Sequence, residues 1–411
     1  MRMLAPLRDR DFAVLWCGMA ISLLGDGIYF VAVAWEAYSL SNAPTALSVV
    51  GVAWTLPTVA FLLVGGAISD RYERRRVLLL ASTAEAIAIG LIGGLAVTGE
   101  LRLWMLLVLV ACYGAGEAFF NPAFDAIVPS LVAAEELPSA SALEQFVRPL
   151  ALQMVGPAVG GVLVAAFDPG IAFLVDAGTF VAAAICLSIM RRIPRDPSIG
   201  ARRSALSEIA DGVRFVRANP WLWGTLVAAS LSLLAFFGPL VVLVPYLVKN
   251  ELHAGAGAFG AIRAVGGVAA IATALVIAQR RLPRRCMTFM FGAWGLQSLL
   301  LAGYALATEV WTFALVSLIS GVMAVTGNVI WGTLMKTLVP DQLLGRVSSL
   351  DWIVSIGLVP MSLALTGPIA QAVGARATLV AAGVLGASTF VVLLAVPGIR
   401  DPEHAPLQRL S

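Results

Sequence analysis

The stretch "GGAISDRYERRRVLLL", residues 65–80, places a cluster of charged side chains between two long apolar runs. Apolar residues make up 60% of the chain and charged residues only 12%, about half the share that is usual in soluble domains. Uncharged runs recur at residues 43–69, 149–167, 221–248, 286–308, 310–335, 352–375 and 377–399. About 20 apolar residues cross a bilayer as a helix, so the composition predicts an integral membrane protein with residues 65–80 as a surface loop.

The runs and the breakers between them predict an all-α protein of twelve transmembrane helices. Their expected ranges are 12–40, 44–69, 77–98, 103–129, 142–167, 171–190, 221–249, 254–279, 286–307, 309–339, 345–372 and 375–397. The one long charged connection is residues 191–220, whose part 204–218 has the apolar spacing of a helix lying along the membrane surface. We therefore expect a six-helix bundle over 1–190, a cytoplasmic linker over 191–220 and a second six-helix bundle over 221–411.

Positive charge is distributed unevenly between the two sides of this arrangement. If the N-terminus is inside, only Arg102, Lys249 and Arg376 fall outside, and Arg148 and Arg263 fall within helices. The rest of the 27 lysine and arginine residues are on the inner side, as the positive-inside rule requires. The sequence therefore predicts both termini in the cytoplasm. The use of 25 arginines and 2 lysines is typical of GC-rich bacterial genomes, so we expect a multi-pass protein of the bacterial inner membrane.

Several classes of function lack their signatures in the sequence. The lysines occur in "LVKN" and "LMKT", neither of which completes a phosphate-binding loop, and the two histidines stand apart from each other. The four cysteines are scattered through apolar segments without a C-x-x-C pair, which favours packing roles. We expect no enzyme activity, cofactor, metal or nucleic-acid partner. The partners we expect are the lipid bilayer, protons and a hydrophobic small molecule, bound by a monomer.

An internal repeat supports two related halves. Arg284 and Arg285 follow the second helix of the second half, as Arg74 and Arg75 follow the second helix of the first. Two pseudo-symmetric six-helix bundles of parallel topology are a known transporter plan, with the substrate bound near the middle of the bilayer.

Two motifs resemble those of the major facilitator superfamily. "GAISDRYERRRVLL", 66–79, is similar to its loop signature G-x-x-x-D-R-x-G-R-[RK], with Glu73 where glycine is usual. "MVGPAVGGVL", 154–163, resembles its antiporter motif. The stretches "FFNPAFDAIVPSLV", 119–132, and "LLGRVSSL", 343–350, resemble the branch that holds macrolide-efflux and enterobactin-exporter proteins. The matching positions are Gly66, Asp70, Arg71, Arg74 and Arg75 in the loop, and Gly156, Pro157, Gly160 and Gly161 in the antiporter motif.

The resemblance implies that the loop is a conformational latch. Asp70 would meet the positive N-terminal end of the eleventh helix near Arg346, and the loop arginines would pair with Asp125. Such contacts would hold the cytoplasmic side closed in the outward-facing form and break when the inside opens. The alternative is that the arginines only anchor the loop inside. For the antiporter motif, the resemblance implies a tight seam between the halves, and the alternative is ordinary helix packing.

Carboxylates inside the expected spans call for an explanation, because a charge near the bilayer centre is costly. Asp26 and Glu117 are the most central, on the first and fourth helices, which border the central cavity in this superfamily. We expect them, with Glu36 and Arg263, to be candidates for proton coupling or substrate binding. The alternative for each acid is a packing role with a neighbouring hydroxyl or amide, and Arg263 could pair with an acid or bind an anionic group.

The remaining charged and aromatic candidates have weaker signals. Glu144 and Arg148 are four residues apart and are expected to form a structural pair, and structural roles are also favoured for Glu85 and Asp176. Aromatic residues that could line a hydrophobic pocket are Trp54, Tyr113, Phe119, Phe236, Phe237 and Trp331.

These observations predict a secondary active transporter that exports a drug-like compound or a siderophore in exchange for protons by alternating access. The alternatives are uptake or facilitated diffusion of a metabolite, which the antiporter motif disfavours, and a membrane receptor or scaffold without transport. The receptor alternative does not explain carboxylates in mid-membrane.

Overall fold

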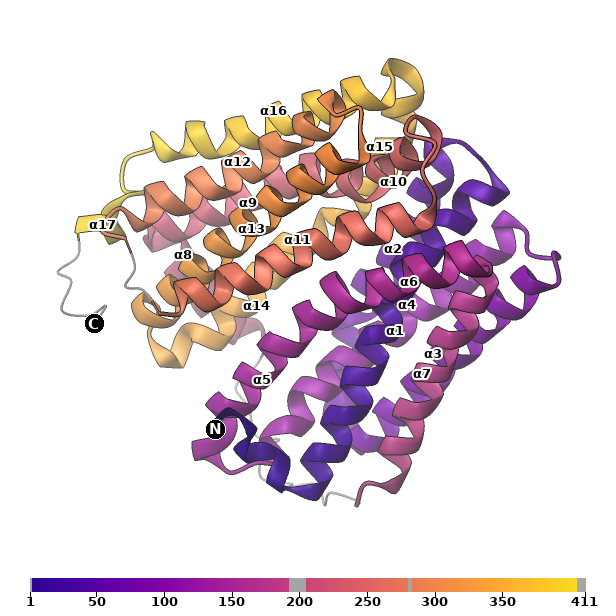
Figure 1. Cartoon of the computed structure of the whole chain (residues 1–411). Helices are drawn as coiled ribbons and strands as arrows, with labels where there is room; N and C mark the ends of the chain where they lie inside the picture. Colours follow the sequence, from indigo (N-terminus) through magenta and orange to yellow (C-terminus); the bar gives the residue numbers. More distant parts are fainter. Residues whose placement is uncertain (1, 192–204, 280–282, 405–411) are drawn as a thin grey trace. The chain divides into compact units, whose positions relative to one another are not determined.

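The computed structural model describes residues 2–191, 205–279 and 283–404, which form helices and the turns between them (Figure 1). By their internal contacts these residues divide into two compact units. Unit 1 comprises Met1–Arg195 and Pro245–Gly267, and unit 2 comprises Asp196–Val244 and Val268–Ser411. The stretch 245–267 therefore packs with the N-terminal helices, although the sequence places it in the second half of the chain. The bundle limits at 190 and 221 remain a prediction.

The helices of unit 1 follow one another with short connections. They are α1 (Arg10–Leu40), α2 (Pro44–Arg71), α3 (Arg74–Val97), α4 (Leu103–Ile127), α5 (Leu137–Pro149), α6 (Gly156–Ala166) and α7 (Pro169–Ile189), joined by most of α10 (Val244–Asn250) and the first part of α11 (Ala256–Ile277). Helix α1 begins where the side chain of Asp9 accepts a hydrogen bond from the backbone N–H of Phe12 at 2.9 Å, which satisfies a free donor of the first turn.

Unit 2 contains the remaining helices. They are α8 (Ala205–Ala218), α9 (Pro220–Gly238), α12 (Cys286–Leu306), α13 (Val310–Leu338), α14 (Asp341–Gly357), α15 (Val359–Val373), α16 (Ala375–Leu394) and the short α17 (Asp401–His404), with the end of α11. Helix α8 matches the surface helix expected over 204–218, while residues 192–204 of the linker lie outside the described part of the chain.

Within the described residues, 12 helical segments are long and apolar enough to cross a membrane. The structure thus confirms the expected all-α class and the number of spans, and the protein is a multi-pass membrane protein. Two spans are interrupted by π-helical turns, at Leu150–Val155 between α5 and α6 and at Pro239–Leu243 between α9 and α10. Each turn adjoins a proline, which removes a backbone donor from the regular hydrogen-bond ladder.

Each unit has its own apolar interior. In unit 1, α2 packs on α4, α3 on α4 and α7, and α1 on α6 and α7. In unit 2, α12 packs on α13 and α16, and α9 on α15 and α16. Many large apolar side chains elsewhere on the helices are exposed, among them Leu80, Trp104, Val391 and Val392, as lipid-facing surfaces require.

Candidate functional site

The hydroxyl of Tyr113 on α4 lies beside Asp26 on α1. Tyr113 donates a hydrogen bond of 2.7 Å to Oδ1 of Asp26. Tyr113 is only 2% exposed, whereas Asp26 is half-buried. The ring of Tyr113 is fixed by Tyr29, whose ring centroid lies 5.0 Å away. Asp26 is therefore a half-buried carboxylate whose Oδ1 accepts a hydrogen bond from a buried neutral donor.

A second carboxylate on α4, Glu117, has a similar arrangement. The indole Nε1 of Trp54 on α2 donates to Oε2 of Glu117 at 2.6 Å. Glu117 and Trp54 are both half-buried, and the ring of Phe30 packs edge-to-face on Trp54 at 5.5 Å. We expected Trp54 and Tyr113 as pocket walls, but the structure makes them the hydrogen-bond partners of the two central acids.

Two further acids are sealed inside the same unit. Glu85 on α3 is 2% exposed and Asp176 on α7 is fully buried. Oδ1 of Asp176 lies 3.3 Å from the Thr179 hydroxyl, and Oδ2 has no hydrogen-bond partner within the described residues. All four acids act electrostatically on the Tyr113 hydroxyl, so they occupy one neighbourhood.

Glycines on the facing helices make room for these sealed acids. A methyl group at Gly25 would lie 2.2 Å from Oδ1 of Asp176, and one at Gly116 would lie 2.9 Å from Oε1 of Glu85. An acid and a glycine on different helices cannot be paired from the sequence, so this association was missed.

The other charged candidates of unit 1 lie farther along the helices. Glu144 and Arg148 form an ion pair of 3.1 Å on α5. Glu36 is buried near the end of α1, within electrostatic range of Lys249 and Asp168. Arg263 is half-buried on α11, and its role remains a prediction.

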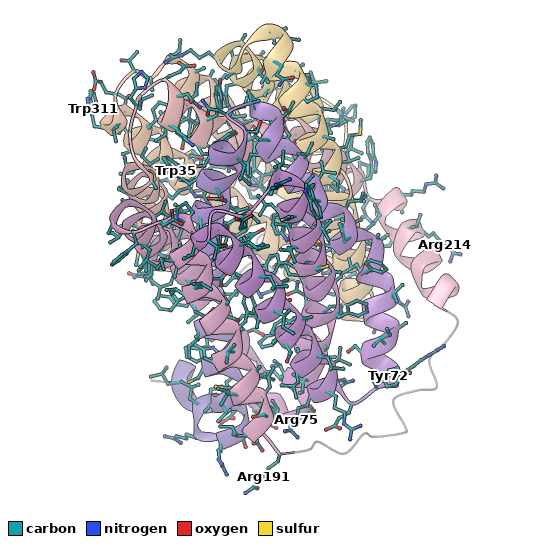
Figure 2. All side chains as sticks on the ribbon, turned by 90° about the vertical axis from the view of Figure 1, so that its right-hand side faces the viewer. Trp35, Tyr72, Arg75, Arg191, Arg214 and Trp311 are labelled. Carbon is teal, nitrogen blue, oxygen red and sulfur yellow. The ribbon has the colours of Figure 1, made fainter. Side chains whose placement is uncertain are left out.

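The loop arginines differ from the expected arrangement. Arg74 donates to the carbonyl of Ala126 at 2.7 Å, and Arg75 donates from Nε to the carbonyl of Leu187 at 2.7 Å and from Nη2 to that of Ser188. These carbonyls lie at the C-terminal ends of α4 and α7, where the helix leaves acceptors free and favours positive charge. The structure thus gives these two arginines carbonyl partners, and the pairing of the loop arginines with Asp125 stays a prediction. Figure 2 shows Tyr72, Arg75 and Arg191 at one end of unit 1, with Trp35 toward the other.

The contacts expected for the other residues of the latch stay predictions. The electrostatic neighbours of Asp125 include Glu144 and Arg148 of α5. The side chain of Asp70 lies outside the described residues. Gly66 and Arg71 end helix α2, and Arg346 lies on α14 of unit 2.

The antiporter motif brings backbones into close approach. A methyl group at Gly156 would lie 2.6 Å from Cα of Gly27, and one at Gly160 would lie 2.9 Å from Cα of Ile28, both on α1. Gly161 faces Gly260 of α11 within the same unit, and Pro157 is buried. Through the residues of this motif, α6 therefore packs tightly against α1 and α11.

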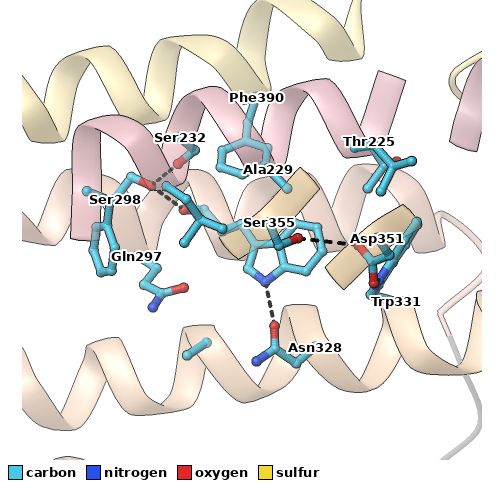
Figure 3. Close-up of a pocket in the computed structure, with 15 residues that line it drawn as sticks. Thr225, Ala229, Ser232, Gln297, Ser298, Asn328, Trp331, Asp351, Ser355 and Phe390 are labelled. Carbon is cyan, nitrogen blue, oxygen red and sulfur yellow. Dashed lines mark hydrogen bonds between the residues drawn. The ribbon is translucent and has the colours of Figure 1, made fainter. Parts of the chain in front are cut away.

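Unit 2 contains a pocket of about 320 Å³ (Figure 3). Helices α9, α12, α13, α14 and α16 contribute its walls. Phe236 and Trp331 line it, as does Asp351, whereas Phe237 is not among its lining residues. Phe119 belongs to unit 1, where its ring stacks on Phe61 at 6.2 Å. The volume falls in the range of small-molecule sites.

Hydrogen bonds join the polar side chains of this pocket to one another and to its tryptophans. Trp331 Nε1 donates to Oδ2 of Asp351 at 3.1 Å, and the Ser355 hydroxyl donates to Oδ1 at 3.4 Å. Trp294 Nε1 donates to Oδ1 of Asn328 at 3.1 Å. The pocket thus combines aromatic walls with a carboxylate and an amide, which is an arrangement suited to an amphipathic molecule.

The fold is that of the major facilitator transporters. A bacterial homologue of the iron transporter ferroportin, solved in an inward-facing state, matches with a TM-score of 0.69 and 16% identity, over 94% of this chain and 99% of that chain. A POT family transporter solved with a thioalcohol-conjugated peptide gives a TM-score of 0.71 at 13% identity, over 95% and 96%. The chain therefore shares its fold with solved membrane transporters.

The chain belongs to the transmembrane secretion effector family, whose model matches residues 1–410. Among its relatives is macrolide efflux protein A of Streptococcus pyogenes, 24% identical over 386 residues, which are 91% of this chain and 93% of that protein. Another is the multidrug efflux pump Tap of Mycolicibacterium fortuitum, 27% identical over 419 residues, or 97% and 98% of the two chains.

Proposed function

We propose that this protein exports hydrophobic, drug-like molecules from the cytoplasm in exchange for protons, by alternating access. Two relatives that match nearly the whole chain carry the names of efflux proteins, for macrolides and for multiple drugs. The structural observation that carries the proton part is the pair of half-buried acids, Asp26 and Glu117, each held by one neutral aromatic donor.

The four acids of unit 1 differ in burial, and this difference supports a role in proton exchange for only two of them. A coupling acid must exchange protons with water on at least one side of the membrane during the cycle. Asp26 and Glu117 are partly exposed, whereas Glu85 and Asp176 are sealed. We therefore assign proton exchange to the first pair and a structural role to the second. The charged groups in range of the first pair are each other, Glu85, Asp176 and Arg148.

The cycle follows from this assignment. Protonation of Asp26 and Glu117 from the outside removes negative charge from unit 1, releases the cargo and favours return to the inward-facing form. Loss of the protons to the cytoplasm restores the site for the next molecule. Because a ligand shifts a conformational equilibrium only through its different affinity for the two states, protons and cargo must prefer opposite states.

Topology and assembly complete the proposal. The arginine-rich loops favour an orientation with both termini in the cytoplasm, and we propose that the protein acts as a monomer in the inner membrane. Uptake or facilitated diffusion of a metabolite, and a receptor without transport, are the competing functions.

Reconstitution into liposomes tests the proposal. With the lumen made acidic relative to the outside, proteoliposomes should accumulate a macrolide or a lipophilic dye from the cytoplasmic face, and collapse of the gradient with a protonophore should stop accumulation. A siderophore in the same panel tests the other cargo class. Equal flux with and without the gradient would indicate facilitated diffusion, and absence of flux for every compound would favour the receptor function.

A further inference from the structure

Aromatic rings form part of the wall of the pocket in unit 2. Trp294 and Trp331 meet edge-to-face with ring centroids 6.4 Å apart, and Phe390 packs on Trp294 at 5.8 Å. All three line the pocket (Figure 3). Aromatic faces carry partial negative charge, so such walls attract both flat apolar groups and cations.

Asp351 gives the pocket its charge. Among the described residues that line the cavity, it is the one with a charged side chain. Each of its oxygens accepts one hydrogen bond from a neutral donor, at 3.1 Å from Trp331 and 3.4 Å from Ser355. A carboxylate can accept about four hydrogen bonds, so these two leave capacity for a ligand.

A buried carboxylate within a membrane protein is costly unless a positive charge or hydrogen bonds compensate it, and a cationic ligand would supply that charge. The aromatic rings, the carboxylate and the volume of about 320 Å³ together define a complementary ligand. It has an apolar body with aromatic groups and carries a positive charge that it keeps when it leaves water.

We propose that the pocket between α9, α12, α13, α14 and α16 binds a lipophilic organic cation, with Asp351 as its counter-charge. The amide of Gln297, which makes no hydrogen bond within the described part of the chain, and that of Asn328 supply polar contacts to the ligand. The role of this cation as cargo rests on the proposed export function. Binding itself does not depend on transport.

Equilibrium binding to the purified full-length protein in detergent, without any gradient, tests the inference. The probe is radiolabelled tetraphenylphosphonium, and the competitor is tetraphenylborate, which has nearly the same shape and the opposite charge. We expect the wild-type protein to bind the cation, and the borate to compete poorly. Asp351→Asn should weaken cation binding at least tenfold and make the borate a better competitor.

Three further variants test whether negative charge in the pocket, rather than a general effect of substitution, determines the cation affinity. Asp351→Glu restores the charge and should recover most of the affinity. Asn328→Asp keeps the oxygen that accepts from Trp294 and adds a second negative charge, so it should tighten cation binding several-fold. Glu100→Gln, which removes an exposed carboxylate in the turn after α3, should leave the affinity unchanged.

The outcomes separate the two proposals. Wild-type affinity in Asp351→Asn, or equal competition by the borate, would overturn the inference even if the protein exports drugs. Binding that depends on Asp351 with no transport in liposomes would retain the cation site and refute the export function. Lack of cation binding by the wild-type protein would also overturn the inference.

Discussion

Tyr113 on α4 donates a hydrogen bond of 2.7 Å to Asp26 on α1, and this bond joins the two helices through the most central acid of the chain. Glu117, one turn along α4 from Tyr113, is held in the same way by Trp54 of α2. A single helix thus participates in both acid sites. Protonation of either acid changes the electrostatic environment of the other, because both act on the Tyr113 hydroxyl.

Neutralising Asp26 should abolish proton coupling while leaving cargo binding intact. We expect Asp26→Asn to lose uphill export driven by a pH gradient, because the amide cannot take up a proton. The variant should still exchange unlabelled for labelled cargo across liposomes at equal pH, since Tyr113 can donate to the amide oxygen. Uphill export at the wild-type rate would remove Asp26 from the mechanism, and Glu100→Gln is the control for expression and charge.

The sealed acid Glu85 should behave differently. Replacing it by Gln removes the cost of a buried carboxylate while keeping the shape of the side chain, so we expect thermal stability to stay the same or rise. Export should persist, because the proposal assigns proton exchange to Asp26 and Glu117 and a structural role to Glu85, which is 2% exposed. Thermal unfolding in detergent and gradient-driven uptake measure the two effects. Loss of uphill export with an unchanged melting temperature would instead make Glu85 a coupling residue.

The antiporter motif should tolerate no side chain at Gly160. The methyl group of Gly160→Ala would lie 2.9 Å from both Cα and the carbonyl oxygen of Ile28, so α6 must move away from α1. Overpacking of this kind costs about 1–3 kcal/mol, which should lower the melting temperature. Gly178→Ala on α7 meets no atom within 4 Å and is the matched control. Equal melting temperatures for the two variants would show that the packing of α6 is not tight.

The arginines that follow α2 should contribute unequally to stability. Arg75→Ala leaves the terminal carbonyls of α7 without their charged donor, and we expect a loss of about 1.5 kcal/mol, the scale of a hydrogen bond to a charged group. Arg76 pairs with Glu73 at 2.8 Å, but its side chain is 64% exposed. Arg76→Ala should therefore change stability by less than about 1 kcal/mol. Denaturant or thermal unfolding measures the loss of stability in the two variants. Equal losses would contradict the role of Arg75 as a cap of α7.

The fold could be predicted because the membrane imposes strong rules on composition. Long uncharged runs defined the spans, and the uneven distribution of arginine suggested their orientation. The π-helical turns at Leu150–Val155 and Pro239–Leu243 could not be predicted from the apolar runs. The packing of 245–267 with unit 1 depends on glycine contacts such as Gly161 with Gly260, which join segments far apart in sequence.

Sequence reasoning identified the two central acids of the candidate site but not the residues that bind them. Asp26 and Glu117 stood out by their depth within a span. Their donors, Tyr113 and Trp54, could be recognised as aromatic residues of the spans but not as partners of acids. The role of Asp351 was missed because it depends on which faces of five helices converge on one cavity. Arg74 and Arg75 were matched to Asp125 by resemblance, whereas free carbonyls at helix ends take their donors here.

Cargo-driven proton movement tests the central claim most directly. Proteoliposomes containing a pH-sensitive dye are given a transported compound with no initial pH gradient, and the internal pH is followed in time. We predict that cargo entering the liposomes drives protons out and makes the lumen more alkaline for the wild-type protein, and that Asp26→Asn abolishes the signal. Cargo transport without any proton movement in the wild-type protein would contradict the account.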